Sequence, residues 1–173
     1  MVGIDVAGAF FDHDRGDVTL VQGDMSSLGS VPAVQGRQFD KILFFQSISY
    51  ARDQVQTLVD ARNLLAAGGR ILVQRSHPIR FAVERARANG TTLGEEYYST
   101  EPYAYRSGWN SDVTLTHSTE TFSTMLNTFA AAALTVDAAI EPELSAEARE
   151  RYPHKQDWLN QHLGVILFVL SAR

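Results

Sequence analysis

The chain has 173 residues, 45% of them hydrophobic and 20% charged, which fits one globular domain and excludes a disordered chain. It contains no cysteine, which excludes disulfides, thiolate zinc sites and cysteine nucleophiles. The net charge of −5 argues against a nucleic-acid partner. The start has no signal-peptide pattern, and the longest strongly apolar run, 165–170, is too short to span a bilayer, so we expect a cytoplasmic protein without a membrane partner.

The first 75 residues alternate apolar runs with polar turns. The elements predicted there are strands over 2–4, 18–21, 41–45 and 71–73, helices over 7–13 and 54–67, and a loop over 26–38. The run 41–45 is continuously apolar, which indicates a strand covered on both faces. Asp53 is expected to cap the second helix and Gly68-Gly69 to stop it. Strand, helix and strand joined by short connections are typical of a parallel sheet.

The rest of the chain continues this pattern around one irregular segment. Predicted are helices over 78–89, 122–133 and 145–151, strands over 134–140 and 165–170, and an aromatic insertion over 91–116 that we interpret as a hairpin. Pro78 suits a first helical position, and Gly90 a helix end. Because the sequence shows no repeat and no linker, we expect one domain over 1–173.

Polar residues follow four of the predicted strands. They are Asp5, the turn Gly23-Asp24-Met25, the pair Gln46-Ser47 and the pair Ser76-His77. In open parallel sheets, ligands bind beyond the carboxyl ends of the strands. An acid at one such end can accept hydrogen bonds from ribose hydroxyls, and an acid at the next can accept one from an adenine amine. The two aspartates are equally typical of turn residues and helix caps, and spacing alone leaves both interpretations open.

Several segments, taken in order, match a known family. The runs VGIDVAGAF, DVTLVQGDMSSL, FDKILFFQSISY and ARNLLAAGGRILV resemble the class I S-adenosylmethionine-dependent methyltransferases. The later segments SHPIR, TFSTMLNTF, IEPELSAEARERYP and GVILFVLSAR resemble a subgroup that acts on small molecules. The resemblance implies an α/β, Rossmann-like methyltransferase fold. Its sheet would be mostly parallel with an antiparallel C-terminal strand, its first strand–helix unit would be missing, and the aromatic insertion would follow the SHP strand.

The resemblance also implies a cofactor, S-adenosylmethionine, and residues that bind it. Asp5 would bind the ribose, Asp24 and the backbone of Met25 the adenine, and Gln46 and Ser47 the methionine end. The residues implied for the pocket of a small-molecule substrate are Tyr50, Tyr97, Tyr98, Tyr105 and Trp109, with His77 and His117 as candidate catalytic bases. The histidines are also typical of surface or capping positions, and the aromatic residues of a lid packed on the core. No metal site is expected.

One departure from the family concerns the cofactor. The family opens with a strand and a glycine-rich turn of the D-x-G-x-G-x-G kind, and no such cluster stands before the strand at 2–4 or elsewhere in this sequence. That strand normally separates the strands predicted here at 2–4 and 41–45. We therefore expect either that these two pair directly, or that a second chain supplies the neighbour by dimerisation or strand exchange.

Three functional hypotheses follow. The first is a small-molecule methyltransferase that depends on S-adenosylmethionine, with its activity in doubt because the glycine-rich turn is absent. The second is a methyltransferase-like enzyme that catalyses a cofactor-independent reaction, for example a cyclisation or an isomerisation. The third is a non-catalytic partner of a complete homologue.

Overall fold

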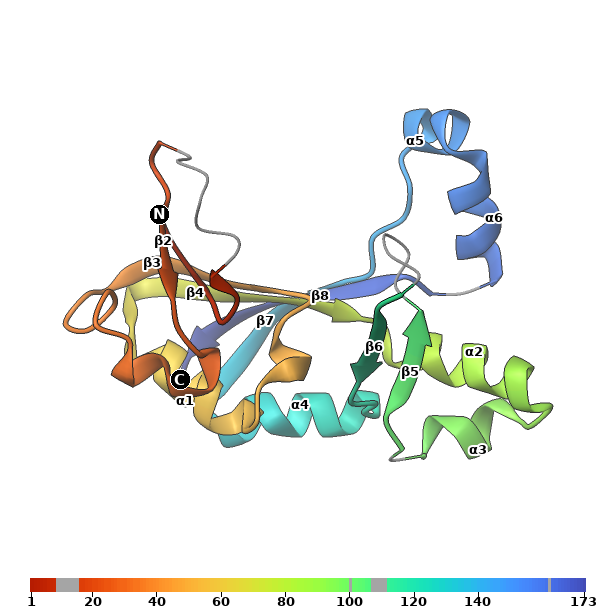
Figure 1. The fold of residues 1–173 in the computed structure, drawn as a ribbon, viewed down its shortest axis with the longest axis horizontal. Coiled ribbons are helices and arrows are strands. Elements are labelled where there is room, and N and C mark those ends of the chain that lie inside the picture. Colours follow the sequence, from red (N-terminus) through yellow and green to blue (C-terminus); the bar gives the residue numbers. More distant parts are fainter. Residues whose placement is uncertain (9–15, 100, 107–111, 162) are drawn as a thin grey trace.

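The fold is organised around a mixed sheet of four strands (Figure 1). The computed structural model describes residues 1–8, 16–99, 101–106, 112–161 and 163–173. The strands of this sheet are, in spatial order, β3 (Phe39–Phe45), β4 (Leu65–Ser76), β8 (Val165–Ala172) and β7 (Leu134–Ile140). β3 and β4 are parallel, whereas β8 is antiparallel to both of its neighbours. This arrangement confirms the predicted α/β class and the antiparallel C-terminal strand.

Two smaller pairs of strands flank the main sheet. β1 (Val2–Asp5) and β2 (Thr19–Gln22) form a parallel pair. β5 (Tyr103–Arg106) and β6 (Thr114–His117) form an antiparallel pair, which confirms the interpretation of the aromatic insertion as a hairpin. Among the described residues, β1 pairs with β2 alone and β3 with β4 alone. The direct pairing of β1 with β3, one of the two predicted alternatives, is therefore not formed.

The helices agree with the sequence pattern except that the helix starting at residue 54 ends before the predicted residue 67 and that two helices, at 93–97 and 153–161, were not predicted. Their bounds are α1 (Gln54–Asn63), α2 (Pro78–Asn89), α3 (Leu93–Tyr97), α4 (Phe122–Ala131), α5 (Ala146–Arg151) and α6 (Pro153–Gln161), with short 3₁₀ helices at Met25–Ser30 and Ile48–Tyr50. The helix α6 was not predicted because it has no apolar stripe, and none of its residues is buried. The helix predicted over 7–13 falls mainly outside the described residues. In the described ranges, no helix is both long and apolar enough to cross a bilayer.

The hydrophobic core lies between the main sheet and two helices, α1 and α4, which pack on the same face (Figure 1). Its central side chains are Leu58 and Ala61 of α1, Met125 and Phe129 of α4, and Ile71, Val73, Ile166, Phe168 and Leu170 of the sheet. The rings of Phe129 and Phe168 meet edge to face, with centroids 5.0 Å apart. Burying each large apolar side chain contributes about 1.5–3 kcal/mol, so this layer supplies most of the driving force for folding.

The prediction that β3 is covered on both faces is wrong. Phe44 is buried against the core, but Leu43 and Phe45 on the opposite face are 49% and 55% exposed. A continuous apolar run shows that a strand is hydrophobic on both faces, and it does not show what packs on the second face. Here the helices cover only one face of β3.

The prediction that Gly68-Gly69 stops the preceding helix is also wrong. Asp53 caps α1 as expected, but the helix ends at Asn63, and Gly68 and Gly69 lie within β4. Gly68 has a φ of +76°, and a Cβ on Gly69 would lie 3.0 Å from the carbonyl oxygen of Phe39. Gly68 therefore permits a left-handed backbone conformation within β4, and Gly69 permits a close approach of β4 to the backbone of β3.

The turn after α4 gives a test of backbone strain. Ala133 has a φ of +55°, a conformation that costs a residue with a Cβ about 1–2 kcal/mol and that favours glycine. The change Ala133→Gly should raise the free energy of unfolding by about 0.5–1 kcal/mol after the entropy of glycine is deducted. Urea unfolding measures this, with Ala132→Gly as the control. Ala132 is buried with a φ of −77°, so its replacement should destabilise the fold.

Candidate functional site

The carboxyl ends of β1 and β2 bring two aspartates close together. Asp5 lies opposite Gln22 in the strand register, and its carbonyl accepts a hydrogen bond from Gly23 N at 2.9 Å, one residue before Asp24. The Asp5 Oδ1 atom accepts a hydrogen bond from Ala7 N at 2.8 Å. Its Oδ2 atom has no hydrogen bond within the described residues, so one oxygen of this exposed carboxylate remains available for a ligand.

Asp24 uses both of its oxygens within the protein. Oδ1 accepts a hydrogen bond from Ser26 N at 2.8 Å and caps the 3₁₀ helix, while Oδ2 is 2.7 Å from the Arg52 guanidinium. The Ser26 contacts, assisted by Arg52, hold the pKa of Asp24 below its usual value. The neighbouring Met25 side chain packs against the core. The sequence left open whether Asp24 binds a ligand or caps a helix, and the structure shows that it caps the 3₁₀ helix.

Gln46, directly after β3, has a strained backbone. Its φ of +54° is unusual for a residue with a side chain, and such strain costs about 1–3 kcal/mol and concentrates at functional sites. Its backbone N donates to Gln74 O at 2.9 Å, and its side-chain Oε1 accepts from the Ser76 hydroxyl at 3.3 Å. Ser47 follows at the start of the second 3₁₀ helix and makes no side-chain capping bond there. The ends of β3 and β4 are thus joined by polar contacts.

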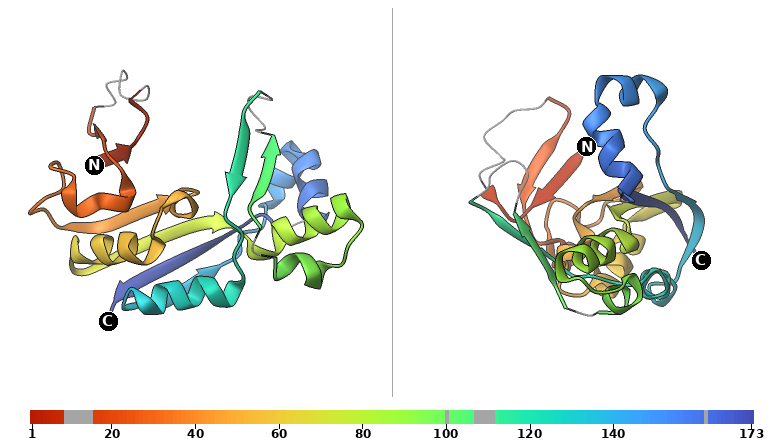
Figure 2. Two further views of the ribbon diagram at one scale, coloured as in Figure 1. Left: turned by 60° about the horizontal axis from the view of Figure 1, so that its bottom comes forward. Right: turned by 90° about the vertical axis from the view of Figure 1, so that its right-hand side faces the viewer.

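Three predicted residues from distant segments meet at the hairpin. Nε2 of His117, at the end of β6, lies 2.9 Å from the Tyr50 hydroxyl and 3.0 Å from that of Tyr105. The ring of Tyr105 stacks on the imidazole with centroids 5.5 Å apart, and Phe81 of α2 lies 5.3 Å away. We call these four residues the His117 cluster. The hairpin of β5 and β6, which carries Tyr105 and His117, stands beside α2 and α3 at the end of the main sheet (Figure 2).

The electrostatics of the cluster favour a neutral imidazole. His117 is only 4% exposed, and this desolvation, followed by the charges of Arg80 and Arg75, lowers its pKa. Burial also raises the pKa of Tyr50, so its phenol keeps its proton near neutral pH. A neutral imidazole with two phenols beside one ring nitrogen is an arrangement that can accept a proton.

The other predicted aromatic residues have different positions. The Tyr97 hydroxyl accepts a hydrogen bond from Phe122 N at 2.8 Å, which joins α3 to the start of α4. Tyr98 is 75% exposed and packs edge to face on Tyr97. Trp109 lies outside the described residues.

His77 occupies the position of a helix cap. Its Nδ1 atom accepts a hydrogen bond from Ile79 N at 3.2 Å at the start of α2, and its Nε2 atom is 2.7 Å from Oε1 of Glu141. Because Nδ1 accepts, Nε2 carries the proton and donates it to Glu141. Both ring nitrogens are therefore engaged inside the protein.

A small pocket lies at the carboxyl end of β4, and we call it the β4 pocket. Six residues that line it are Ser49, Arg75, Ser76, Phe81, Ser118 and Glu120. Arg75 and Glu120 were not among the predicted site residues. The available signal, for Arg75 alone, was a charged residue two positions after the apolar run of a buried strand. Across the described ranges, no group of three or more His, Asp or Glu residues is placed to hold a metal ion.

Comparisons with known proteins identify the fold. No family model and no curated protein matches the chain. Among solved structures, a protein of Listeria monocytogenes assigned as an S-adenosylmethionine-dependent methyltransferase superposes with a TM-score of 0.74 at 15% identity, covering 99% of this chain and 79% of that one. An S-adenosylmethionine-dependent methyltransferase of Mesorhizobium loti gives 0.67 at 15% identity, covering 98% and 78%. The glycopeptide N-methyltransferase MtfA with bound S-adenosyl-L-methionine gives 0.60 at 12% identity, covering 99% and 72%.

The chain has a methyltransferase fold. At these identities the likeness establishes the fold and leaves the activity to be argued from the site.

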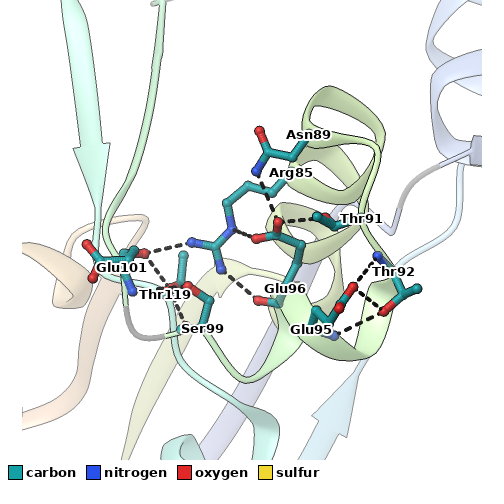
Figure 3. Close-up of polar contacts among 9 residues, drawn as sticks. All are labelled: Arg85, Asn89, Thr91, Thr92, Glu95, Glu96, Ser99, Glu101 and Thr119. Atoms are coloured by element: carbon teal, nitrogen blue, oxygen red, sulfur yellow. Dashed lines mark hydrogen bonds and ion pairs between the residues drawn. The ribbon is translucent and has the colours of Figure 1, made fainter.

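A polar network holds the aromatic insertion in place (Figure 3). Arg85 of α2 is buried and forms an ion pair with Glu96 of α3 at 3.1 Å. Its two terminal nitrogens donate to the carbonyl oxygens of Glu96 and Glu101, both at 2.7 Å. The Thr119 hydroxyl donates to the carbonyl of Glu101 at 3.0 Å. One guanidinium thus ties α2, α3 and the segment that enters the hairpin.

Removing this guanidinium should destabilise the fold strongly. In Arg85→Met the Glu96 carboxylate loses its charged partner and two carbonyls lose donors, so we expect a loss of about 3–5 kcal/mol. Thermal or urea unfolding measures it. The control Arg149→Met breaks an exposed ion pair with Glu143 and should cost no more than about 1 kcal/mol. Equal losses in the two variants would contradict the role assigned to Arg85.

The lowered pKa of His117 predicts how stability depends on pH. The unfolded imidazole, with its usual pKa of 6.5, binds a proton more readily than the folded one. Stability is therefore fully present above that value and falls as the pH drops through it toward the folded pKa. Urea unfolding between pH 7.5 and pH 5 measures the slope at about half-unit steps. The variant His117→Asn should flatten it, whereas His154→Asn, at an exposed histidine, should keep the wild-type slope.

Proposed function

We propose that this chain is an S-adenosylmethionine-dependent methyltransferase that acts on a small molecule. The observation that carries the proposal is the placement of Asp5 and Asp24 at the carboxyl ends of two neighbouring parallel strands, within a fold shared with methyltransferases. In open α/β sheets this edge is where ligands bind. The methyltransferase MtfA, of the same fold, has the cofactor bound.

The residues present fit the adenosine half of the cofactor. The available Oδ2 atom of Asp5 can accept a hydrogen bond from a ribose hydroxyl. Asp24 is held by Ser26 and Arg52, so it would shape the adenine site with the backbone of Met25 rather than offer a free oxygen. Gln46 and Ser47 would line the methionine end, where the Gln46 backbone is strained and its side chain accepts a hydrogen bond from Ser76 of β4. When bound, the cofactor supplies the methyl group.

In this proposal His117 accepts the proton of the substrate. A neutral imidazole nitrogen has one lone pair, so Nε2 fully accepts a hydrogen bond from only one of its two tyrosine neighbours at a time. The hydroxyl that donates to Nε2 can at the same time accept a hydrogen bond from a substrate, so that it takes up the substrate's proton as it passes its own to Nε2. Tyr50 suits this relay because its side chain is half exposed, whereas Tyr105 is stacked on the imidazole.

The apolar side of the cluster would exclude water from the reacting groups. Phe81 contacts the rings of Tyr103 and His117, at 4.9 Å and 5.3 Å between centroids. Burial and the nearby Glu84 carboxylate raise the pKa of Tyr103 to about 12, so this phenol stays uncharged. An apolar surface that excludes water strengthens nearby polar contacts and would help to orient a small substrate against the methyl donor. His77, with both nitrogens engaged, is assigned to capping α2.

Calorimetric titration with S-adenosylhomocysteine tests the cofactor site without turnover. Wild-type protein should bind it, and Asp5→Asn should weaken binding about tenfold or more, because a charge-assisted hydrogen bond contributes about 1.5–3 kcal/mol. The control Asp40→Asn changes an exposed carboxylate near the amino end of β3 and should leave the affinity unchanged. Absence of binding by the wild-type protein at millimolar ligand would refute the proposed function for this chain.

A further inference from the structure

A larger pocket lies at the amino end of β4, and we call it the Arg62 pocket. It is lined by Arg62 of α1, residues 65–70 of β4 and residues 171–172 of β8, and its volume is about 240 Å³. Drug-sized ligands occupy pockets of about 300–1,000 Å³, so this pocket has room for a smaller molecule. The end of β8 points away from the hairpin of β5 and β6 (Figure 1), so the pocket and the proposed substrate groups lie at opposite ends of the sheet.

Arg62 carries a charge at a position where the helical spacing predicts an apolar residue. It stands four residues after Leu58 and three after Val59, both of which pack in the core region. Its Nη1 atom donates to the carbonyl of Ala132 at 2.9 Å, and its Nη2 atom donates to Oδ1 of Asn63 at 3.3 Å. Both acceptors are uncharged. Among the described residues, no carboxylate forms an ion pair with this half-buried guanidinium, so its charge is not compensated.

Arg70 is the second arginine of the pocket, and its charge is compensated. Its Nε atom lies 2.7 Å from Oδ2 of Asp137. The other oxygen of that carboxylate accepts a hydrogen bond from the Ser171 hydroxyl at 2.8 Å, so Asp137 is fully engaged. Nη1 of Arg70 donates to the carbonyls of Gly68 and Gly69, at 2.7 Å and 3.0 Å. Its Nη2 atom has no acceptor within the part of the chain that the structure describes.

The charge balance of the pocket favours an anionic ligand. Two arginines and one aspartate leave a net charge of one positive unit, and Nε of Arg62 and Nη2 of Arg70 are both donors without a described acceptor. A guanidinium binds phosphate and carboxylate oxygens strongly. Here the two guanidinium groups come from different elements, α1 and β4, so they would approach a ligand from different directions. A tetrahedral phosphate presents oxygens to both, whereas a planar carboxylate presents them in one plane.

We propose that the Arg62 pocket binds the phosphate group of a small phosphorylated molecule. The phosphate would lie between the guanidinium groups of Arg62 and Arg70, and the short apolar side chains of Leu65 and Ala66 would border the rest of the ligand. The pocket contains none of the residues assigned to the cofactor or to proton transfer. The proposal therefore stands apart from the proposed function and can be tested without it.

Three probes with the same three-carbon frame test the pocket: glycerol 3-phosphate, glycerate and glycerol. Protein-observed NMR titration of the wild-type chain at low salt should give a dissociation constant of about 1 mM or below for glycerol 3-phosphate. Glycerate should bind at least about fivefold more weakly, and glycerol should not bind at about 10 mM. The variant Arg62→Gln should weaken the binding of glycerol 3-phosphate about tenfold. The control Arg149→Gln, at an exposed ion pair, should leave it unchanged.

The variant Asp137→Asn separates loss of the site from damage to the fold. It removes the negative charge beside Arg70, so glycerol 3-phosphate should bind about threefold or more tightly, whereas damage to the fold would weaken binding. Equal binding of glycerate, no binding of glycerol 3-phosphate at about 10 mM, unchanged affinity in Arg62→Gln, or weaker binding in Asp137→Asn would overturn the proposal. Asp5→Asn should not affect this binding, so failure of the cofactor site and failure of this pocket give different results.

Discussion

Burial of the Arg75 guanidinium at the carboxyl end of β4 constrains how the rest of the chain can fold. A charge in this position requires a partner, and Glu120 comes from the connection between β6 and α4. Such a pair adds little net stability compared with apolar residues, but the loss of either partner is strongly destabilising. Its effect is therefore to fix where the insertion returns to the sheet. His117 stands three residues before Glu120, so the same contact fixes the position of the imidazole.

A second buried arginine constrains the insertion from its other end. Arg85 binds the carbonyls of Glu96 and Glu101, before the hairpin begins. No described residue of the insertion belongs to the main hydrophobic core, so polar contacts have a large part in defining its conformation. Arg85 binds the segment before the hairpin and Arg75 binds Glu120 after it, so the stacked pair of Tyr105 and His117 is held in a defined place. Precise placement of this kind is what a reaction between two bound molecules needs.

The elements that were predicted well have local signals. The helix α2 begins at Pro78 and ends before Gly90, which has a φ of +68°, because proline and glycine fix the backbone at those two points. The helix α4 follows its apolar spacing. The covering of β3 was predicted incorrectly because it depends on neighbours distant in sequence. Gly68-Gly69 was misassigned because glycines allow positive φ angles and close approach of strands within a sheet, as well as the ends of helices.

Sequence patterns identified the candidate site only in part, because the partners of its residues are distant in the sequence. The type of residue made both His77 and His117 candidates for a base, and their partners in the structure distinguish them. His77 is engaged at both nitrogens, whereas His117 meets two tyrosines, one of them 67 residues away in the chain. Glu120 gave no signal, because its pairing with Arg75 depends on how the hairpin returns to the sheet.

Several energetic costs are concentrated at the end of the sheet where β3 and β4 terminate. Gln46 has a strained backbone, His117 is desolvated, and Glu120 has a buried oxygen without a partner in the described structure. Each of these lowers the stability of the free protein, and core packing elsewhere must offset them. A chain selected only for folding would have no reason to keep all three within one region. A bound ligand changes this balance, because it can contact the Gln46 segment and use the neutral imidazole. Their concentration at this edge is therefore the physical argument for a ligand site there, independent of the resemblance to methyltransferases.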